Sequence, residues 1–256
     1  MRKFDENINL ISIVVPVYNA ESFIKTTMAT VQAQTYVEWE LLLVDDCSSD
    51  SSCGLIQLEI DKDSRIKLIH QEVNKGAASA RNRGVLEAQG RYICFLDADD
   101  IWDADKLEKQ INFMNEKSAG FCFSGYEFAD EFGNGLGKIV QVPEKITYEQ
   151  ALKNTTIFTS TVMIDRNIVA DEDIFMPNIP SEDTATWWNI LKKYGIGYGL
   201  NENLVKYRRS TNTLSSNKLI AIKRIWNLYR KQERLPLIKS LYCMFFWAFR
   251  AVARRV

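Results

Sequence analysis

An apolar run ends abruptly in three acids at Tyr92-Ile93-Cys94-Phe95-Leu96-Asp97-Ala98-Asp99-Asp100-Ile101-Trp102. Residues 92–96 are β-branched, aromatic or otherwise apolar and follow Gly90, a pattern typical of a buried strand in a parallel sheet. The acids therefore fall at the carboxyl end of this strand. In open α/β sheets, that edge is where ligands bind.

The three carboxylates of this stretch need a positive charge among them, because like charges this close repel one another. Their hard oxygen atoms suit a divalent cation such as Mg2+ or Mn2+, and a cation with open positions can hold a diphosphate. We expect Asp97 and Asp99 to take this role, since no capping function needs acids inside a strand end. For Asp103 we favour the alternative, in which it is the N-cap of a helix over residues 104–117.

Three strand-and-helix units precede the acidic stretch. The expected strands cover residues 10–15, 40–44 and 66–69, and the expected helices run from a capping Asn19 to about residue 34, from the Ser-rich turn 47–52 to residue 60, and over residues 77–88. This alternation predicts an α/β fold with a doubly wound, mostly parallel sheet. The sequence contains neither the glycine pattern of dinucleotide-binding proteins nor that of P-loop proteins.

The chain downstream of the acids is less regular. After the helix that ends at residue 117, we expect strands over residues 121–128, 160–164 and 195–204, a turn at 133–137 and a short helix over 148–153. A proline-broken loop over residues 176–180 then delivers Ser181-Glu182-Asp183 to a helix over residues 184–193. A serine N-cap, with acids stabilised by the helix dipole, explains this triplet as well as a functional role does.

The composition limits the class of function. The chain has 256 residues, 46% of them hydrophobic and 25% charged, as expected for one large core with or without an appendage. The single histidine, His70, argues against the usual zinc sites and histidine triads, and we expect it to be structural. Five cysteines without a CxxC pair are typical of reduced thiols in a cytosolic protein. Residues 1–9 show no signal peptide, and no window holds the ~20 apolar residues of a membrane span.

The last part of the chain differs in charge from the rest. From Lys218 onward there are ten basic residues against one acid, Glu233, whereas 22 basic and 32 acidic residues precede it. The aromatic-rich run 241–249 is too short to span a membrane, but a basic, amphipathic segment suits the surface of an anionic membrane. We favour contact of residues 219–256 with the inner face of the membrane. Packing of a helical hairpin on the catalytic domain, or on a second subunit, is the alternative.

At five places, in order, the sequence resembles the family 2 glycosyltransferases, inverting enzymes with a GT-A fold that act on nucleotide sugars. The similar segments are Val14-Val15-Pro16-Val17-Tyr18-Asn19, Leu43-Val44-Asp45-Asp46-Cys47-Ser48-Ser49-Asp50, Asn74-Lys75-Gly76 with Ala80-Arg81-Asn82, Asp97-Ala98-Asp99-Asp100 and Glu182-Asp183. The resemblance covers roughly residues 11–217. It implies a Rossmann-like sheet flanked by helices, in a domain over residues 10–217 that follows a lead over residues 1–9 and precedes a basic, amphipathic, helical tail over residues 218–256.

The resemblance places the nucleotide-binding half of that domain at residues 10–102. Its pocket would consist of Pro16, Val17, Tyr18, Asn19, Asp45 and Asp46. There Tyr18 would stack on the base, and Asp46 rather than Asp45 would accept a hydrogen bond from the pyrimidine N–H. Lys75 and Arg81 would neutralise phosphate, although a solvated helix-end charge is the alternative for each.

The Asp97-Ala98-Asp99 segment would also bind the donor. By resemblance, Asp97 contacts the ribose or a bound water, and Asp99 ligates the Mn2+ or Mg2+ that bridges the diphosphate. Such a cation offsets the negative charge that develops on the leaving group. Arg208 or Arg209 would face the diphosphate as well, with Ser210 where the family frequently has a histidine.

The acceptor and catalytic-base half would occupy residues 103–217. Asp183 resembles the family's general base, which takes the proton of the acceptor hydroxyl as that oxygen attacks the anomeric carbon. We expect Glu182, Trp187 and Trp188 beside the acceptor, the two indoles as an apolar wall or a platform. For at least one of the two tryptophans we favour plain core packing instead.

The expected activity is transfer of a sugar, with inversion, from a UDP-sugar or similar donor to a glycan or lipid-linked glycan in surface polysaccharide biosynthesis. An aspartyl-nucleophile phosphohydrolase, with Asp97 attacking phosphorus and Asp99 as the acid, is the alternative enzyme. An inactive sugar-binding or scaffolding relative is the alternative without activity. The transferase would be cytoplasmic and peripheral on the membrane and would bind no nucleic acid, and its oligomeric state stays open.

Overall fold

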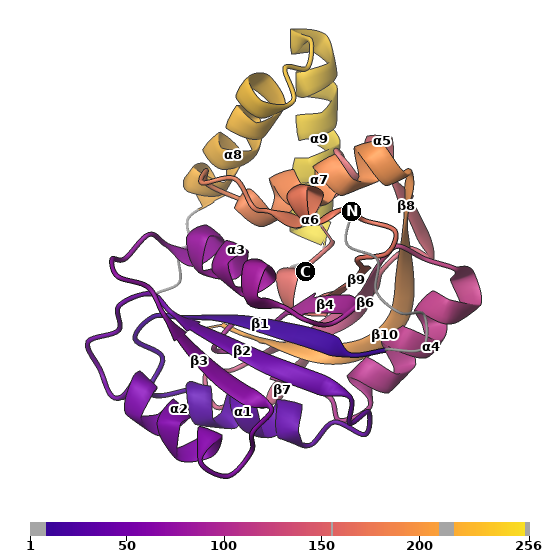
Figure 1. Cartoon of the computed structure of the whole chain (residues 1–256). Coiled ribbons are helices and arrows are strands. Elements are labelled where there is room, and N and C mark those ends of the chain that lie inside the picture. Colours follow the sequence, from indigo (N-terminus) through magenta and orange to yellow (C-terminus); the bar gives the residue numbers. More distant parts are fainter. Residues whose placement is uncertain (1–8, 155, 210–217, 254–256) are drawn as a thin grey trace.

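The computed structural model describes residues 9–154, 156–209 and 218–253 (Figure 1). Its centre is a ten-stranded sheet with the order β3-β2-β1-β4-β9-β6-β10-β5, in which β7 pairs with β6 and β8 with β10. Helices cover both faces of the sheet, and the end of the chain forms a helical hairpin on one side (Figure 1). Ser210 and most of the lead lie outside the described residues.

The first half of the sheet is parallel. It consists of β1 (Ile11–Val17), β2 (Trp39–Asp45), β3 (Ile66–His70) and β4 (Tyr92–Phe95). Every residue of β2 and β4 is buried, because helices cover both faces of these strands. The predicted parallel α/β order of the first hundred residues is therefore confirmed.

Side chains that alternate along these strands belong to two different cores. Ile13 and Leu41 pack on the side of α1 (Ile24–Gln32) and α2 (Ser52–Ile60), whereas Val14 and Leu42 pack on the side of α3 (Ala77–Glu87). A Cβ added at Gly84 of α3 would lie 2.3 Å from Cγ1 of Val14. The small residues of α3 thus let it lie directly on the sheet, as the sequence suggests.

The second half of the sheet is mixed rather than parallel. Its elements are β5 (Ile101–Trp102), α4 (Lys106–Lys117), β6 (Phe121–Ala129), β7 (Gly135–Val140), β8 (Lys145–Thr147), β9 (Val162–Asp165) and β10 (Ile196–Arg208). Strand β9 runs antiparallel to both β4 and β6, while β10 runs parallel to β6. The predicted turn at residues 133–137 lies at the β6–β7 hairpin, where Gly133 adopts a φ of 87°.

Two of the predicted helix caps are wrong. Helix α1 starts at Ile24, and Asn19 instead lies in the preceding loop with a φ of 48°, where its Oδ1 accepts a hydrogen bond from the Ser49 amide at 2.9 Å. Helix α4 starts at Lys106, so Asp103 is also outside its helix. In both cases a loop of polar residues takes positions that the sequence pattern assigns to the first helical turn.

A helical layer covers the α3 face of the second half of the sheet (Figure 1). It comprises α5 (Tyr148–Ala151), the short 3-10 helix η1 (Thr159–Thr161), α6 (Asp171–Ile174) and α7 (Glu182–Tyr194). The Trp187 ring of α7 lies against the rings of Phe95 on β4 and Phe121 on β6, with centroids 5.9 and 5.6 Å away. This contact anchors α7 over the middle of the sheet.

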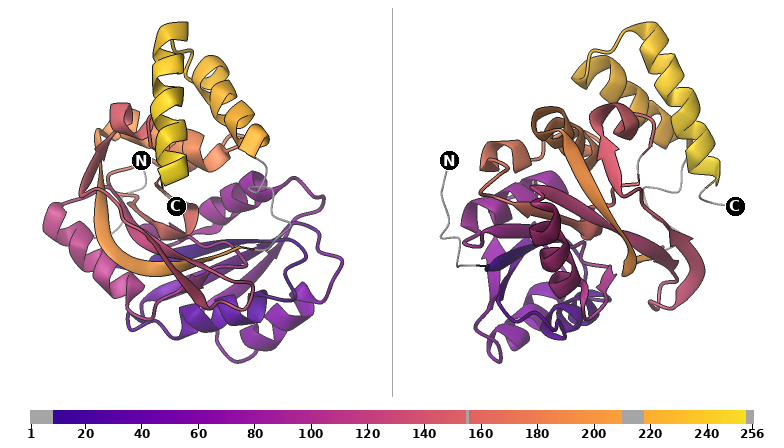
Figure 2. Two further views of the ribbon diagram at one scale, coloured as in Figure 1. Left: turned by 180° about the vertical axis from the view of Figure 1, so that it is seen from behind. Right: turned by 90° about the vertical axis from the view of Figure 1, so that its right-hand side faces the viewer.

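The tail forms a hairpin of α8 (Lys218–Asn227), the π-helical segment η2 (Leu228–Gln232) and α9 (Leu237–Ala253), which projects from the domain in both views of Figure 2. Its inner side packs on the helical layer: Tyr229 stacks on Trp188 with centroids 5.4 Å apart and planes at 3°, and its hydroxyl donates to the Leu152 carbonyl. Glu233 adds an ion pair with Lys192 at 2.9 Å. The inner side of the tail thus packs on the catalytic domain as a helical hairpin, which is the alternative stated in the sequence analysis above.

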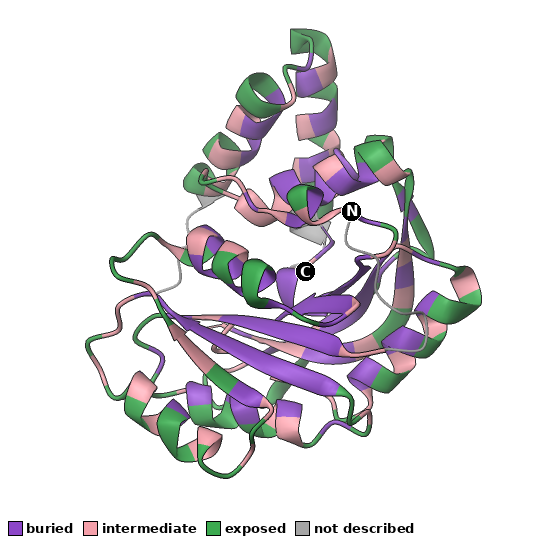
Figure 3. Ribbon diagram, in the orientation of Figure 1, coloured by how far each residue is buried: buried purple, intermediate pink, exposed green. Residues whose placement is uncertain are grey.

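The outer side of the tail is exposed (Figure 3), and on α9 the exposed side chains are largely apolar. They include Ile238, Leu241, Tyr242, Phe245 and Phe249, of which Ile238 is 84% exposed. Among the residues that the structure describes, no helix is both long and apolar enough to cross a membrane. The tail therefore has one side suited to its own domain and one side left for another surface.

We expect Tyr229→Ala to lower the free energy of unfolding by about 3–5 kcal/mol, because it removes a buried aromatic ring and the hydrogen bond to Leu152. Urea unfolding followed by tryptophan fluorescence measures this loss. Ile238→Ala is the matched control in the same hairpin, and we expect it to change stability by less than about 0.5 kcal/mol. Equal effects of the two substitutions would show that the hairpin does not pack as described.

Candidate active site

The carboxyl ends of β1, β2 and β4 bring the predicted site residues to one edge of the sheet. Asp97, Asp99 and Asp100 follow β4 directly, and Asp45 and Asp46 stand at the end of β2. Helix α3 and the start of α7 border the same edge. The observed pairing of the strands therefore places five acids, from two segments far apart in the sequence, at the edge where α/β sheets bind ligands.

Arg81 of α3 joins two of the predicted motifs. Its Nη2 lies 2.6 Å from Oδ1 of Asp97, and its Nη1 lies 3.0 Å from Oε1 of Glu182, at the start of α7. Burial lowers the pKa of Arg81, but the charges of Asp97, Glu182 and Asp183 outweigh it and raise this pKa overall. With its side chain only 7% exposed, Arg81 is a fixed cation among three acids rather than a solvated helix-end charge.

Asp99 and Asp100 carry charge that the protein does not fully offset. Burial, followed by repulsion from Asp97, raises the pKa of Asp99 to about 6. Burial and both neighbouring acids raise the pKa of Asp100 well above its ordinary value, although its carboxylate accepts hydrogen bonds from the Ser160 hydroxyl at 2.5 Å and the Arg208 amide at 3.2 Å. Asp100 is thus a buried anchor that these hydrogen bonds hold in place, while Asp99 is the less buried of the two acids.

Arg208, at the end of β10, lies beneath these acids. Its side chain is buried, its Nε has no hydrogen-bond partner among the described residues, and its guanidinium carbon lies 5.2 Å from the Phe23 ring. Burial lowers its pKa, and the charges of Asp99 and Asp100 oppose that shift. The neighbouring Arg209 lies over the Phe128 ring instead, at 4.9 Å, so Arg208 is the arginine at the acidic edge.

Asp183 lies in the first turn of α7, partly buried beside η1. Its Oδ2 accepts a hydrogen bond from the Thr159 hydroxyl at 3.1 Å, and its Oδ1 accepts from the Thr184 amide at 2.6 Å. Ser181 adopts a φ of 62° and makes no side-chain cap, so a plain serine cap does not account for the triplet.

The sequence analysis missed the two hydroxyls of η1. Thr159 contacts Asp183, and Ser160 donates to Asp100 and accepts from the Asp97 amide at 3.1 Å. One short segment therefore touches both acidic motifs. The available signal was the unusual density of hydroxyl side chains between residues 155 and 161.

The two acids at the end of β2 differ in their surroundings. Asp46 accepts hydrogen bonds from the Lys75 and Gly76 amides at 2.8 and 2.7 Å and from the Gln71 side chain at 2.7 Å, so it fixes the loop before α3. Asp45 accepts from the Ser48 amide at 3.1 Å. Both carboxylates are buried.

Asp45 also stands in a cluster of possible metal ligands. Its carboxylate, the Cys53 thiol and the His70 ring have ligand atoms within 4.8 Å of one another. Burial and the nearby Asp45 charge raise the pKa of Cys53 to about 11, which keeps this thiol protonated, and His70 stands 3.4 Å from Asp45. The cluster thus stabilises the β2–β3 edge through hydrogen bonds, in agreement with a structural His70.

The segment that follows β1 forms the outer wall of this edge. Tyr18 is 56% exposed, and its ring is free to contact a ligand, while Val17 is buried. Hydrogen bonds from the Asn19 and Ala20 amides to the hydroxyls of Ser48 and Ser52, at 3.0 and 2.8 Å, tie this segment to the loop after β2.

The expectation that Trp187 and Trp188 form an acceptor platform is wrong. Each ring is only 1% exposed, Trp187 among the sheet aromatics and Trp188 against Tyr229 of the tail. Neither presents a face to a ligand at the surface, because α7 turns this side toward the sheet and the hairpin. The core-packing alternative holds for both, and Glu182 is occupied by Arg81.

Comparison with known proteins identifies the family. The sequence profile described as Glycosyl transferase family 2 matches residues 12–175. The teichuronic acid biosynthesis glycosyltransferase TuaG of Bacillus subtilis is 45% identical over 248 residues, which cover 96% of this chain and 98% of TuaG. The chain belongs to glycosyl transferase family 2. This membership decides between the two enzyme classes in favour of a glycosyltransferase over a phosphohydrolase.

Further relatives of this transferase agree with the assignment. The Escherichia coli protein WfgD, named as a UDP-Glc:alpha-D-GlcNAc-diphosphoundecaprenol beta-1,3-glucosyltransferase, is 41% identical over 92% of this chain and 91% of its own length. The crystal structure of Staphylococcus aureus TarS residues 1–349 with UDP-GlcNAc superposes with a TM-score of 0.68 at 18% identity, over 93% of this chain and 71% of that one. A mannosyltransferase, PcManGT, from Pyrobaculum calidifontis, solved with GDP-Man and Mn2+, gives 0.67 at 17% identity, over 95% and 70%. The transferase therefore has the GT-A fold.

The residues at the acidic edge fit the divalent cation that this fold implies. Asp97 and Asp99 offer hard oxygen ligands, and the raised pKa of Asp99 shows that Arg208 does not fully offset its charge. A cation beside these oxygens would counter both the burial and the repulsion from Asp97 that raise this pKa.

We expect Asp99→Asn to abolish metal-dependent binding of a nucleoside diphosphate, measured by titrating UDP into the transferase with and without Mn2+. The same substitution should stabilise the metal-free fold by about 1–3 kcal/mol at pH 7.5, because an acid with a raised folded-state pKa costs stability as pH rises through about 4 to 6. The gain should shrink as pH falls and vanish below about pH 3, where the acid is protonated in both the folded and the unfolded state.

Asp61→Asn is the control for this prediction, because Asp61 is an exposed acid on α2, away from the acidic edge. It should change neither binding nor stability. UDP binding that stays dependent on Mn2+ in the Asp99→Asn protein would contradict the assignment of Asp99.

Proposed function

We propose that this transferase moves a sugar from a UDP-sugar to a lipid-linked glycan, with inversion of the anomeric centre, in surface polysaccharide biosynthesis. The observation that carries the proposal is the buried Arg81 bridge, which ties Asp97 at the end of β4 to the start of α7, where Asp183 lies. A sugar donor bound at Asp97 would therefore lie beside a general base at Asp183.

The nucleotide would bind at the ends of β1 and β2. Tyr18 offers an exposed ring for stacking on a base, and Pro16, Val17 and Asn19 shape the loop beneath it. We assign the contact with the pyrimidine N–H to Asp45 or Asp46, whose buried carboxylates lie next to this loop. The names of WfgD and of the TarS complex support a uridine nucleotide.

The diphosphate would lie between Arg208 and the acids after β4. Asp97 and Asp99 would hold Mn2+ or Mg2+, which would supply positive charge against the leaving diphosphate. Arg208 adds a buried guanidinium whose Nε–H has no acceptor among the residues that the structure describes. Ala98 brings its main chain to this edge without a side chain that would fill the space.

Asp183 would act as the general base. It takes the proton of an acceptor hydroxyl while that oxygen forms a bond to the anomeric carbon, and the bond from this carbon to the diphosphate oxygen breaks with its electron pair leaving on the diphosphate. A single displacement from the face opposite the nucleotide inverts the centre. The Thr159 hydroxyl, at 3.1 Å from Oδ2, holds the carboxylate in place.

We expect Asp183→Asn to leave UDP affinity unchanged and to lower the rate of sugar transfer by about 10²- to 10⁴-fold, because the amide cannot accept the proton. Release of UDP from a UDP-sugar in the presence of a lipid-linked acceptor measures the rate. Glu172→Gln is the control, because Glu172 is an exposed acid on α6. This variant should transfer the sugar at the native rate. If the Asp183→Asn protein transferred sugar at the native rate, the assignment of Asp183 as the general base would be wrong.

We also propose that the tail holds the transferase on the cytoplasmic face of the membrane. The hairpin also carries basic residues: Lys231 and Arg234 are exposed at its turn, whereas Lys239 and Arg250, beside the apolar side of α9, bond to Glu149 and to the Lys153 carbonyl. Apolar burial and attraction to anionic lipid act together on such a helix. The acceptor named for WfgD is itself lipid-linked, which fits an enzyme that works at a membrane surface.

We expect the double variant Phe245→Ser/Phe249→Ser to reduce binding to vesicles that contain phosphatidylglycerol by about tenfold or more, because two exposed rings no longer insert. Cosedimentation measures the bound fraction. Phe132→Ser is the control, since this ring is 77% exposed but lies on the β6–β7 turn. Equal binding by the double variant and the native protein would place the membrane contact elsewhere or remove it.

A further inference from the structure

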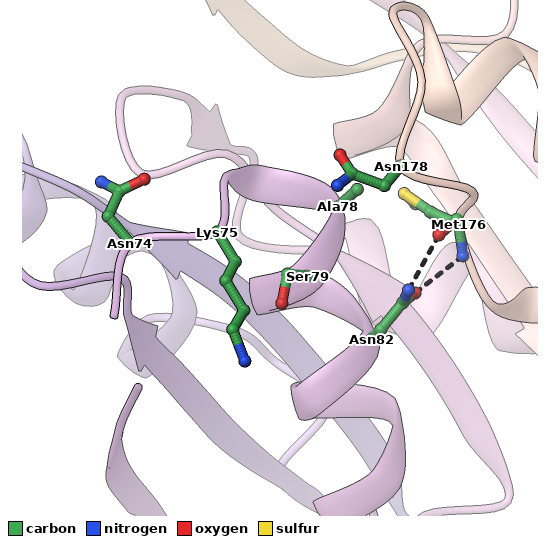
Figure 4. Close-up of a pocket in the computed structure, with 7 residues that line it drawn as sticks. All are labelled: Asn74, Lys75, Ala78, Ser79, Asn82, Met176 and Asn178. Carbon is green, nitrogen blue, oxygen red and sulfur yellow. Dashed lines mark hydrogen bonds between the residues drawn. The ribbon is translucent and has the colours of Figure 1, made fainter. Parts of the chain in front are cut away.

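A polar groove lies between α3 and the loop that precedes α7. Its volume is about 620 Å3, which is within the range of small-molecule sites. Figure 4 shows Ser79 and Asn82 on the helix side and Met176 and Asn178 on the loop side, with Lys75 at the start of the helix. The groove therefore connects the donor half of the transferase with the loop that leads to Asp183.

The groove offers hydrogen-bonding groups that are not used by the protein. Within the described parts of the chain, the side chains of Lys75, Asn74 and Asn178 make no hydrogen bond or ion pair, and all three are exposed. Carboxamides both donate and accept, as sugar hydroxyls do, and an ammonium group binds phosphate as a point charge. This polar lining suits a phosphorylated carbohydrate far better than a lipid chain.

The wall of the groove on the loop side is fixed in position. Asn82 donates from Nδ2 to the Met176 carbonyl at 2.8 Å and accepts at Oδ1 from the Met176 amide at 2.7 Å (Figure 4). Both main-chain groups of one loop residue are thus held by one side chain of α3. A groove with a fixed wall keeps its shape before a ligand arrives, which lowers the cost of binding.

The groove also adjoins the acidic edge. The sulfur of Met176 lies 3.8 Å from Nη1 of Arg81, the same nitrogen that pairs with Glu182. Only five residues lie between Met176 and Glu182 along the chain. A molecule in the groove would therefore be one side chain, that of Met176, away from the Arg81 bridge.

We propose that this groove binds the carbohydrate-diphosphate head of the acceptor, with Asn178 and Asn74 on sugar hydroxyls and Lys75 on phosphate. The inference rests on the proposed function and deepens it, because it assigns a site to the second substrate. It also assigns Lys75 to the acceptor rather than to the donor. The lining of the groove includes none of the residues after β1 and β2, nor Asp97 or Asp99, to which we assign the donor.

The test is calorimetric titration of the full chain with two probes, α-GlcNAc-diphosphofarnesol as a short-chain acceptor and UDP with Mn2+ as the donor fragment. We expect Asn178→Ala and Lys75→Ala each to weaken binding of the acceptor probe by about tenfold, as for the loss of one hydrogen bond to a charged or polar group. Both variants should bind UDP within about twofold of the native protein. Both side chains are exposed, so neither change should unfold the protein.

Arg83→Ala is the matched control, because it removes a cation from the same helix, where Arg83 pairs with Glu87 outside the groove. It should bind both probes as the native protein does. Native affinity of both groove variants for the acceptor probe, or no binding of this probe by the native protein, overturns the proposal. Equal weakening of UDP binding would assign the groove to the donor and overturn it too. Failure of the native protein to bind UDP at all would instead refute the proposed function.

Discussion

The arrangement of the site depends on one buried cation. Arg81 lies 16 residues before Asp97 and 101 residues before Glu182, and it pairs with both. Two ion pairs on one nearly inaccessible guanidinium are costly to break, since removal of either partner leaves a charge without compensation inside the protein. The bridge thus fixes the start of α7 relative to the end of β4, which are the two places that the chemistry must bring together.

A second constraint is the excess of negative charge around that bridge. Arg81 and Arg208 stand against Asp97, Asp99, Asp100, Glu182 and Asp183, and burial raises the pKa of Asp99, Asp100 and Glu182 rather than lowering it. A fold that served only stability would not keep such a cluster, because each unneutralised acid lowers the free energy of unfolding at neutral pH. A site for a cation and a reacting alcohol requires this excess of negative charge. Hydrogen bonds such as the one from Ser160 to Asp100 hold the acids in position.

The sequence was sufficient for the features that follow from local pattern. Buried parallel strands must be apolar on both faces, so continuous apolar runs in the sequence predict β1, β2 and β4. Acids that end such a run predict a site at the carboxyl end of the strand. Strands β5 and β7 are not visible, because one has two residues and the other is almost wholly exposed. The partners of Arg81, the contact of Thr159 with Asp183 and the burial of both tryptophans depend on tertiary packing between distant segments. No spacing rule within a helix or strand encodes these contacts.

The tail shows how packing and binding can share one hairpin. Tyr229 and Trp247 are buried against the domain, while Phe245 and Phe249, on the other side of the same helical segment, stay in solvent. A tail made only for membrane contact would not need a ring stacked on Trp188, and a tail made only for packing would not leave five apolar side chains outward on α9. Trp188 follows Trp187 on α7, so the stacked contact between Tyr229 and Trp188 joins the hairpin to the helix that carries Asp183, and the contact between Trp187 and Phe121 joins that helix to the sheet. A surface that bound the outer side of the hairpin would therefore be connected to the proposed base through α7.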